Sequence, residues 1–180
     1  MRLLKNVNNS VLWLIKSNKW VEQNFSKEAK QQGIDPSRII FAEKLSHAEH
    51  LARHKHADLF IDTFNYNAHT TASDALWSGL PIVTKQGKQF SARVTSSLLT
   101  ACGLSELITK NEKEYEELIY KLATNPKKLK TISLKLSENK TSKPLFNTKQ
   151  YTDNFEKGLQ QAYDLYFNGE HPKNIFVNEN

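Results

Sequence analysis

The residues best placed to do chemistry in this sequence are His69, Thr70 and Thr71, which follow an apolar run (DLFID, 58–62) and a polar loop. They open a stretch with helical spacing, so two hydroxyls and an imidazole would stand beside the free amides of a helix N-terminus. Such a group can hold a diphosphate without a metal or a glycine-rich loop. Thr71 and Asp74 also have the T-x-x-D spacing of a capping box, in which the hydroxyl satisfies the helix itself. Asp74 is therefore either a capping partner or an acceptor for sugar hydroxyls such as those of a ribose.

A second polar group lies upstream, in KLSHAEHLARHKHA. Ser46 and Glu49 have capping-box spacing and predict a helix that starts after the preceding strand. On that helix His50 and Arg53 are candidates for contacting a base, because an imidazole can stack and a guanidinium can donate to carbonyl oxygens. The alternative is that both are ordinary solvated helix residues.

The same helix carries a histidine pattern that needs its own interpretation. His47, His50 and His54 share one helical face at spacings of three and four, which would suit zinc. No carboxylate or cysteine completes an obvious ligand set, so we favour the interpretation without a metal. The sequence also lacks GxSxG, HExxH, Walker and GxGxxG patterns, which counts against hydrolase, metalloprotease, NTPase and simple dinucleotide-dehydrogenase functions.

The elements that must position these residues alternate between strands and helices. Short apolar runs predict the strands, and spacings of three and four predict the helices between them. The expected strands are 11–15, 38–42, 58–62 and 81–84, and the expected helices are 18–32, 46–54, 70–78 and 90–101, with Gly33 as a C-terminal cap. Beyond residue 110 strands give out, and helices are expected at 113–123, 127–136 and 149–167, followed by an irregular tail.

This alternation predicts an α/β fold with a Rossmann-like parallel sheet and helices on both faces. In such sheets ligands bind outside the carboxyl ends of the strands, where both polar groups would lie. Composition agrees with a folded domain: 180 residues, 38% hydrophobic and 24% charged. The formal charge of +6 is spread along the chain, so we expect no nucleic-acid binding. A single cysteine and the absence of a long apolar segment favour a cytoplasmic protein that does not bind membranes.

The segment from His47 to Ile108, HAEHLARHKHADLFIDTFNYNAHTTASDALWSGLPIVTKQGKQFSARVTSSLLTACGLSELI, resembles the O-linked N-acetylglucosamine transferases of glycosyltransferase family 41, the SPINDLY-like group. The resemblance continues through NSVLWLI, SRIIFA and PLFNTKQYT, so it covers nearly the whole chain. It implies the two-domain GT-B architecture, with residues 1–147 as part of the UDP-sugar-binding domain. Residues 148–180 would be a long helix and tail that pack back on the catalytic region.

The resemblance also implies roles for individual residues. His69, Thr70 and Thr71 would hold the diphosphate and Asp74 the ribose. The uracil would face two side chains of the upstream helix and the backbone near a leucine, namely His50, Arg53 and Leu45. At position 47 the resemblance implies a lysine that reaches the ribose, and His47 stands there instead.

The reaction that the resemblance implies is transfer of N-acetylglucosamine from UDP-N-acetylglucosamine to Ser or Thr hydroxyls of proteins, with inversion and without a metal cofactor. The general base, the first catalytic domain, the first strand-helix unit of this domain and the tetratricopeptide repeats have no counterpart in this sequence. They would be supplied in cis or by a separate chain. Alternatives are a relative with another donor, GDP-fucose or UDP-glucose, or a truncated module that binds a nucleotide sugar without catalysis. His69 before the threonine pair favours UDP-N-acetylglucosamine.

Overall fold

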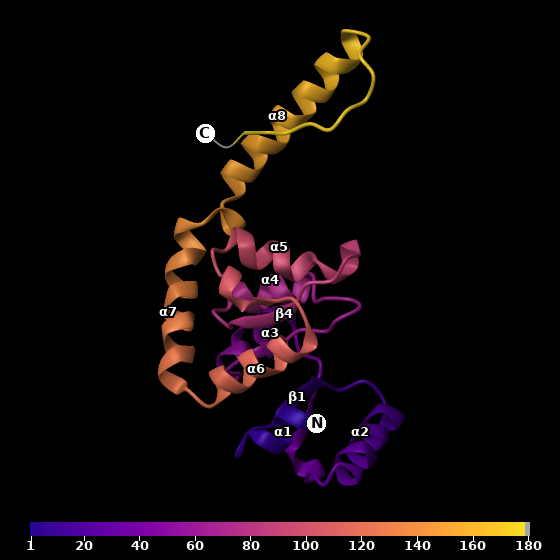
Figure 1. Ribbon diagram of the computed structural model, residues 1–180, viewed down its shortest axis with the longest axis vertical. Helices are drawn as coiled ribbons and strands as arrows, with labels where there is room; N and C mark the ends of the chain where they lie inside the picture. The colour runs from indigo at the N-terminus through magenta and orange to yellow at the C-terminus, as the bar shows by residue number, and fades with distance from the viewer. Residues whose placement is uncertain (179–180) are drawn as a thin grey trace.

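The computed structural model describes residues 1–178, so residues 179 and 180 of the predicted C-terminal segment lie outside the described part. Helices and strands alternate up to residue 109, and helices follow (Figure 1). In chain order the elements are α1 (Arg2–Asn6), β1 (Leu12–Ile15), α2 (Lys19–Gln31), η1 (Pro36–Arg38), β2 (Ile39–Ala42), α3 (His47–Arg53), η2 (His54–His56), β3 (Phe60–Ile61), α4 (Thr70–Trp77), β4 (Ile82–Lys85), η3 (Phe90–Ala92), α5 (Val94–Ala101), η4 (Ser105–Leu107), β5 (Ile108–Thr109), α6 (Glu112–Ala123), α7 (Pro126–Ser142), η5 (Pro144–Phe146) and α8 (Thr148–Phe167).

Every strand pair is parallel, which confirms the predicted α/β class. β1 pairs with β2, and the order β3-β4-β5 forms a second, three-stranded sheet. Ile82 and Val83 of β4 are fully buried, because α4 and α5 cover one side of this strand and α6 the other (Figure 1). This is the layering of a Rossmann-like domain.

The N-terminal unit has its own small core. α2 starts at Asn18, whose side chain accepts hydrogen bonds from the amides of Trp20 and Val21, and it ends before Gly33. Gly33 has a φ of +72°, the left-handed conformation of a helix C′ residue, as predicted. Buried residues of α1, α2, the loop after α2 and β2 form this core, which consists of Leu4, Ala29, Ile34 and Ile39.

Several details differ from the predicted elements, among them helix α1, which was not predicted, and the start of α5 at Val94 rather than at residue 90. The parallel strands form two sheets within residues 1–178 rather than one, because β3 is only Phe60–Ile61 and the chain before it turns through η2. Strand β5 was not predicted: its two residues are too few to show a period. α7 continues to Ser142, beyond the last apolar position, and in this extension the buried Asn139 side chain donates to the carbonyl of Cys102 at 2.7 Å.

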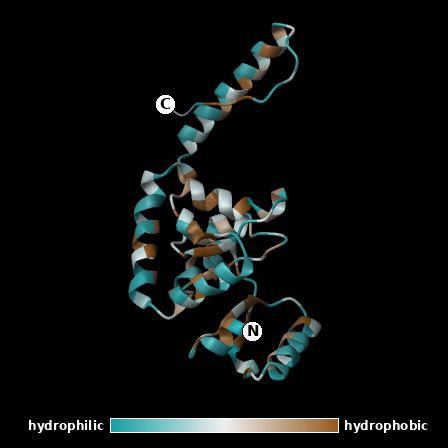
Figure 2. Cartoon of the chain, in the orientation of Figure 1, coloured by the Kyte–Doolittle hydropathy of each residue, from teal (hydrophilic) through white to brown (hydrophobic). Residues whose placement is uncertain are grey.

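α8 and the tail extend away from the body (Figure 1). Asn147 caps α8, and hydrophilic and hydrophobic residues alternate along its whole length (Figure 2). None of its residues is buried within the described chain, and the aromatic side chains of Tyr151, Phe155 and Tyr163 are more than half exposed. That α8 packs back on a larger catalytic region therefore stays a prediction. No helix in residues 1–178 is both long and apolar enough to cross a bilayer.

Burial in the central core predicts how much a cavity-creating substitution lowers the free energy of unfolding. Leu99 of α5 is fully buried, so Leu99→Ala is expected to lower the free energy of unfolding by about 2–5 kcal/mol. Leu134 of α7 is 56% exposed, so Leu134→Ala serves as the matched control and should change it by less than about 0.5 kcal/mol. Urea unfolding followed by circular dichroism measures both. Equal effects of the two substitutions would contradict the packing described here.

Candidate functional site

The two polar groups meet at the N-termini of α3 and α4. His47 Nε2, from the first residue of α3, lies 3.6 Å from Asp74 Oδ1 in the second turn of α4. Both helices follow parallel strands, so their N-termini lie at the carboxyl ends of β2 and β3. Residues more than twenty positions apart in sequence are thus brought to one place, as ligand binding at this edge requires.

The N-terminus of α4 is left open. His69 is the N-cap, and its carbonyl accepts from the amides of Ala72 and Ser73 at 3.1 Å each. Among residues 1–178 neither the amides nor the hydroxyls of Thr70 and Thr71 have a hydrogen-bond partner, and both side chains are exposed. The capping-box alternative for Thr71 is therefore wrong, because Thr71 lies inside the first turn. Free amides with the positive end of the helix dipole form an anion site.

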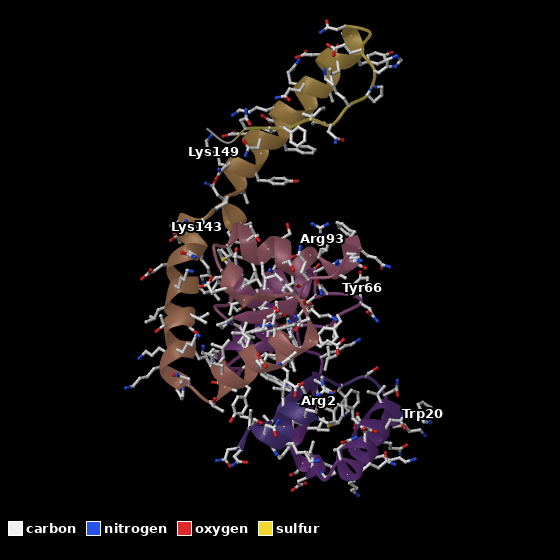
Figure 3. The ribbon with its side chains drawn as sticks, viewed as in Figure 1. Arg2, Trp20, Tyr66, Arg93, Lys143 and Lys149 are labelled. Carbon is white, nitrogen blue, oxygen red and sulfur yellow. The ribbon has the colours of Figure 1, made fainter. Side chains whose placement is uncertain are left out.

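The imidazole of His69 is held beside these amides. Its Nε2 lies 3.3 Å from the carbonyl of Ser91, and the Tyr66 ring stacks on it with centroids 4.6 Å apart. The ring of Phe90, at the start of η3, packs against the imidazole of His69 in a T-shaped arrangement with centroids 6.1 Å apart. Tyr66 lies at the periphery of the central body (Figure 3), so one side of this group faces solvent. Sequence reasoning missed Tyr66 and Ser91, although an aromatic residue three positions before the histidine was a usable signal.

On α3 the predicted capping box is present. The Ser46 amide donates to Glu49 Oε2 at 3.1 Å, and the Ser46 hydroxyl accepts from the Glu49 amide. The hydrogen bonds from the Ser46 hydroxyl and amide lower the pKa of Glu49. Leu45 lies just before this cap, in the exposed loop between β2 and α3.

His50 and Arg53 contact each other. Arg53 donates to His50 Nδ1 at 3.1 Å from Nε and 2.8 Å from Nη2, and its Nη1 donates to the carbonyl of Glu43 at 2.7 Å. Because a guanidinium has no acceptor, His50 Nδ1 must be unprotonated and the ring proton is on Nε2. Burial lowers the pKa of His50, and the nearby His54 and Arg53 lower it further. His50 therefore presents a neutral Nε2–H donor that could meet a base carbonyl.

His47 and His50 of α3 and His54 of η2 are the residues considered for zinc. His54 is buried and bonded through Nδ1 to the carbonyl of His50 at 2.8 Å, while His50 Nδ1 accepts from Arg53. In the described part of the chain no three His, Cys, Asp or Glu side chains are arranged to hold a metal ion. The Nδ1 atoms of His50 and His54 are both engaged within the chain.

Taken together, these features define an α/β protein with Rossmann-like layers in which the N-termini of α3 and α4 lie at the carboxyl ends of parallel strands, and that of α4 carries free amides. The sequence profile of glycosyltransferase family 41 matches residues 1–155. A probable UDP-N-acetylglucosamine–peptide N-acetylglucosaminyltransferase SEC of Arabidopsis thaliana is 36% identical over 99% of this chain and 18% of its own. The corresponding transferase of Caenorhabditis elegans is 36% identical over 94% of this chain and 15% of its own. The chain belongs to glycosyltransferase family 41.

Two further comparisons agree. A SPINDLY transferase of Petunia hybrida is 32% identical over 84% of this chain. The solved structure of a Thermobaculum terrenum O-GlcNAc transferase mutant, K341M, superposes with a TM-score of 0.76 at 24% identity, over 87% of this chain and 31% of that one. This likeness supports the GT-B domain fold. The chain spans less than a fifth of the length of the curated relatives.

The contact between Arg53 and His50 predicts a pKa change. Arg53→Ala should raise the pKa of His50, because it removes one of the positive charges that lower it from its ordinary value of 6.5. Proton NMR titration of the imidazole Cε1–H signals measures this. Arg93→Ala removes the same charge from an exposed residue of another loop and should leave His50 unchanged. An unmoved His50 titration in Arg53→Ala would contradict the geometry.

The lowered pKa also fixes the sign of a pH effect. Below pH 6.5 the unfolded chain takes up a proton at His50 that the folded chain does not yet bind. The free energy of unfolding should therefore fall as the pH drops from 6.5 toward the pKa of folded His50, and level off below it. The same urea unfolding series, repeated across this range with Arg53→Ala, should show a smaller decrease.

Proposed function

We propose that this chain forms the donor-nucleotide half of an inverting protein O-GlcNAc transferase that uses UDP-N-acetylglucosamine. The observation that carries the proposal is the open N-terminus of α4, where the amides and hydroxyls of Thr70 and Thr71 stand free beside His69. The relatives at 36% identity are named for transfer from this donor to peptides. Donor and acceptor of the whole protein are inferred from them.

The site offers a contact for each part of the nucleotide. The α4 amides and threonine hydroxyls would hold the diphosphate, and Asp74 would accept from a ribose hydroxyl. His47, 3.6 Å from the Asp74 carboxylate, would orient that group where a lysine was expected. His50 Nε2–H and the Arg53 guanidinium would face the uracil, with the backbone near Leu45 beside them.

The same groups would assist the reaction itself. Departure of UDP leaves negative charge on the β-phosphate, and fixed amide donors at a helix N-terminus stabilise that charge without reorganising. The proposal needs no metal for this step, because the donors are themselves positive ends of dipoles. The acceptor hydroxyl and the group that deprotonates it belong to the remaining catalytic region, in cis or in a separate chain. We place the protein in the cytoplasm because its only cysteine, Cys102, is an unpaired, buried thiol.

The partners follow from the length of the chain. Because it spans less than a fifth of its relatives, we infer that the other catalytic half and tetratricopeptide repeats complete the enzyme. The exposed apolar side of α8, formed by Tyr151, Phe155, Leu159 and Tyr163, is the surface that the other half would cover. A protein acceptor would then bind between the halves; membranes and nucleic acids have no part in the proposal.

Calorimetric titration of the purified chain tests the donor site. UDP and UDP-N-acetylglucosamine should bind, and His69→Ala or Thr71→Ala should weaken binding about 10- to 100-fold, since a hydrogen bond to a charged group contributes about 1.5–3 kcal/mol. Two exposed residues elsewhere supply matched controls, His171→Ala in the tail and Thr131→Ala in α7, and neither should change the affinity.

The other outcomes separate the alternatives. Tighter binding of GDP than of UDP would indicate a relative that uses GDP-fucose, and turnover of UDP-glucose by the completed enzyme would indicate a glucosyl donor. If none of these nucleotides binds to the folded chain, it is a remnant of the family rather than a working donor domain.

A further inference from the structure

Asp62 is a buried carboxylate that the proposed reaction does not use. It directly follows β3, is 4% exposed, and makes no salt bridge to any residue in the described part of the chain. Burying an unpaired carboxylate costs several kcal/mol unless hydrogen bonds replace the lost water. Its position therefore calls for a structural reason.

Hydrogen bonds to the carboxylate supply that reason. Oδ1 accepts from the amide of Thr63 at 2.9 Å and from the amide of Ala68 at 2.7 Å, while Oδ2 accepts from the Thr84 hydroxyl at 2.6 Å. The backbone carbonyl of Asp62 accepts from the Tyr115 hydroxyl at 2.7 Å. Burial, together with the Asp62 charge, raises the pKa of Tyr115, so this phenol stays a donor.

The two amides bound by Oδ1 are the first and sixth after Asp62, so one oxygen closes the whole loop that leads into α4. Ala68 immediately precedes His69, the N-cap of that helix. The Thr95 hydroxyl holds the carbonyl of Ala68 from the other side at 2.8 Å. The amide of Asn67 also donates to the carbonyl of Ser91 at 2.7 Å, so Asp62 shares in holding this loop and is the buried carboxylate that joins its two ends, next to the first α4 amides.

A carboxylate suits this task better than a neutral acceptor. Hydrogen bonds to an ionised oxygen are about twice as strong as neutral ones, and one carboxylate oxygen can accept two amides at once. An asparagine would keep an acceptor for both amides but would lose the charge, and its amide would meet the Thr84 hydroxyl. An alanine would leave two buried amides without acceptors.

We propose that Asp62 is a positioning residue of the donor site, which ties down loop 63–68 so that the amides of Thr70 and Thr71 are aimed at the diphosphate. This inference rests on the proposed function. Unlike the residues proposed to contact the nucleotide, Asp62 is buried and acts only through the loop. Phosphate binding at the N-terminus of α4 would then require that loop 63–68 stay closed.

The test compares Asp62→Ala and Asp62→Asn with Thr109→Val in the full chain. Thr109 is buried in β5 and donates to the carbonyl of Thr84 at 3.0 Å, so its substitution removes a buried hydrogen bond of the same sheet without touching the loop. We expect UDP affinity to fall at least tenfold in Asp62→Ala, about threefold in Asp62→Asn, and not at all in Thr109→Val, measured by calorimetry. In ¹H–¹⁵N spectra without UDP, the Thr70 and Thr71 amide signals should shift only in the Asp62 variants.

The remaining outcomes distinguish failure of the positioning role of Asp62 from failure of the proposed function. UDP affinity in Asp62→Ala equal to that in Thr109→Val, with unshifted Thr70 and Thr71 amides, would overturn the positioning role. If Asp62→Ala does not fold, Asp62→Asn decides by the same two measurements. If the unsubstituted chain does not bind UDP, the proposed function fails, and the amide signals alone then show whether Asp62 sets the start of α4.

Discussion

Parallel pairing of β3 with β4 is the constraint on which the candidate site depends. A parallel neighbour requires a crossover, and the crossover here is α4, which must start at the carboxyl end of β3 and run back along β4. The buried side of α4, Ala72, Ala75 and Leu76, fixes the rotation of that helix against the core. Packing thus sets the axis of α4, along which the free amides of Thr70 and Thr71 point, and the loop closed by Asp62 helps to set where the helix begins.

The same constraint explains why the two helix N-termini converge. α3 follows β2 as α4 follows β3, so both helices begin at carboxyl ends of parallel strands. The pair between His47 and Asp74 connects these starts although β2 and β3 belong to separate sheets. Arg53 contacts the N-terminal unit, because its guanidinium lies 5.7 Å from the centre of the Trp13 ring, and Arg2 of α1 pairs with Glu116 of α6 at 2.8 Å. In the proposed function His47 and Arg53 would contact the nucleotide. The same two side chains link α3 to its neighbours, His47 to α4 and Arg53 to β1.

Local patterns in the sequence predicted most of this arrangement. Alternating apolar runs and helical spacings gave the strand-helix order, Gly33 and Ser46 marked helix ends, and the position of His69 after DLFID placed the donors at a helix start. Long-range contacts were not predictable in this way. The Asp62 carboxylate binds Thr84 across two strands, and Asn139 of α7 donates to the carbonyl of Cys102. Neither contact leaves a period or a spacing in the sequence, because the partners are more than twenty residues apart.

The exposure of the candidate site has an energetic consequence. Thr70, Thr71 and His47 are exposed, so in this chain alone water competes for every donor and the effective dielectric is high. A hydrogen bond to a diphosphate then contributes toward the lower end of its range. In the enzyme proposed above, a second catalytic half that covered the site would exclude that water and strengthen the same contacts. The loop tied to Asp62 would matter most in that closed state, since donors that are already oriented lose little entropy when the nucleotide arrives.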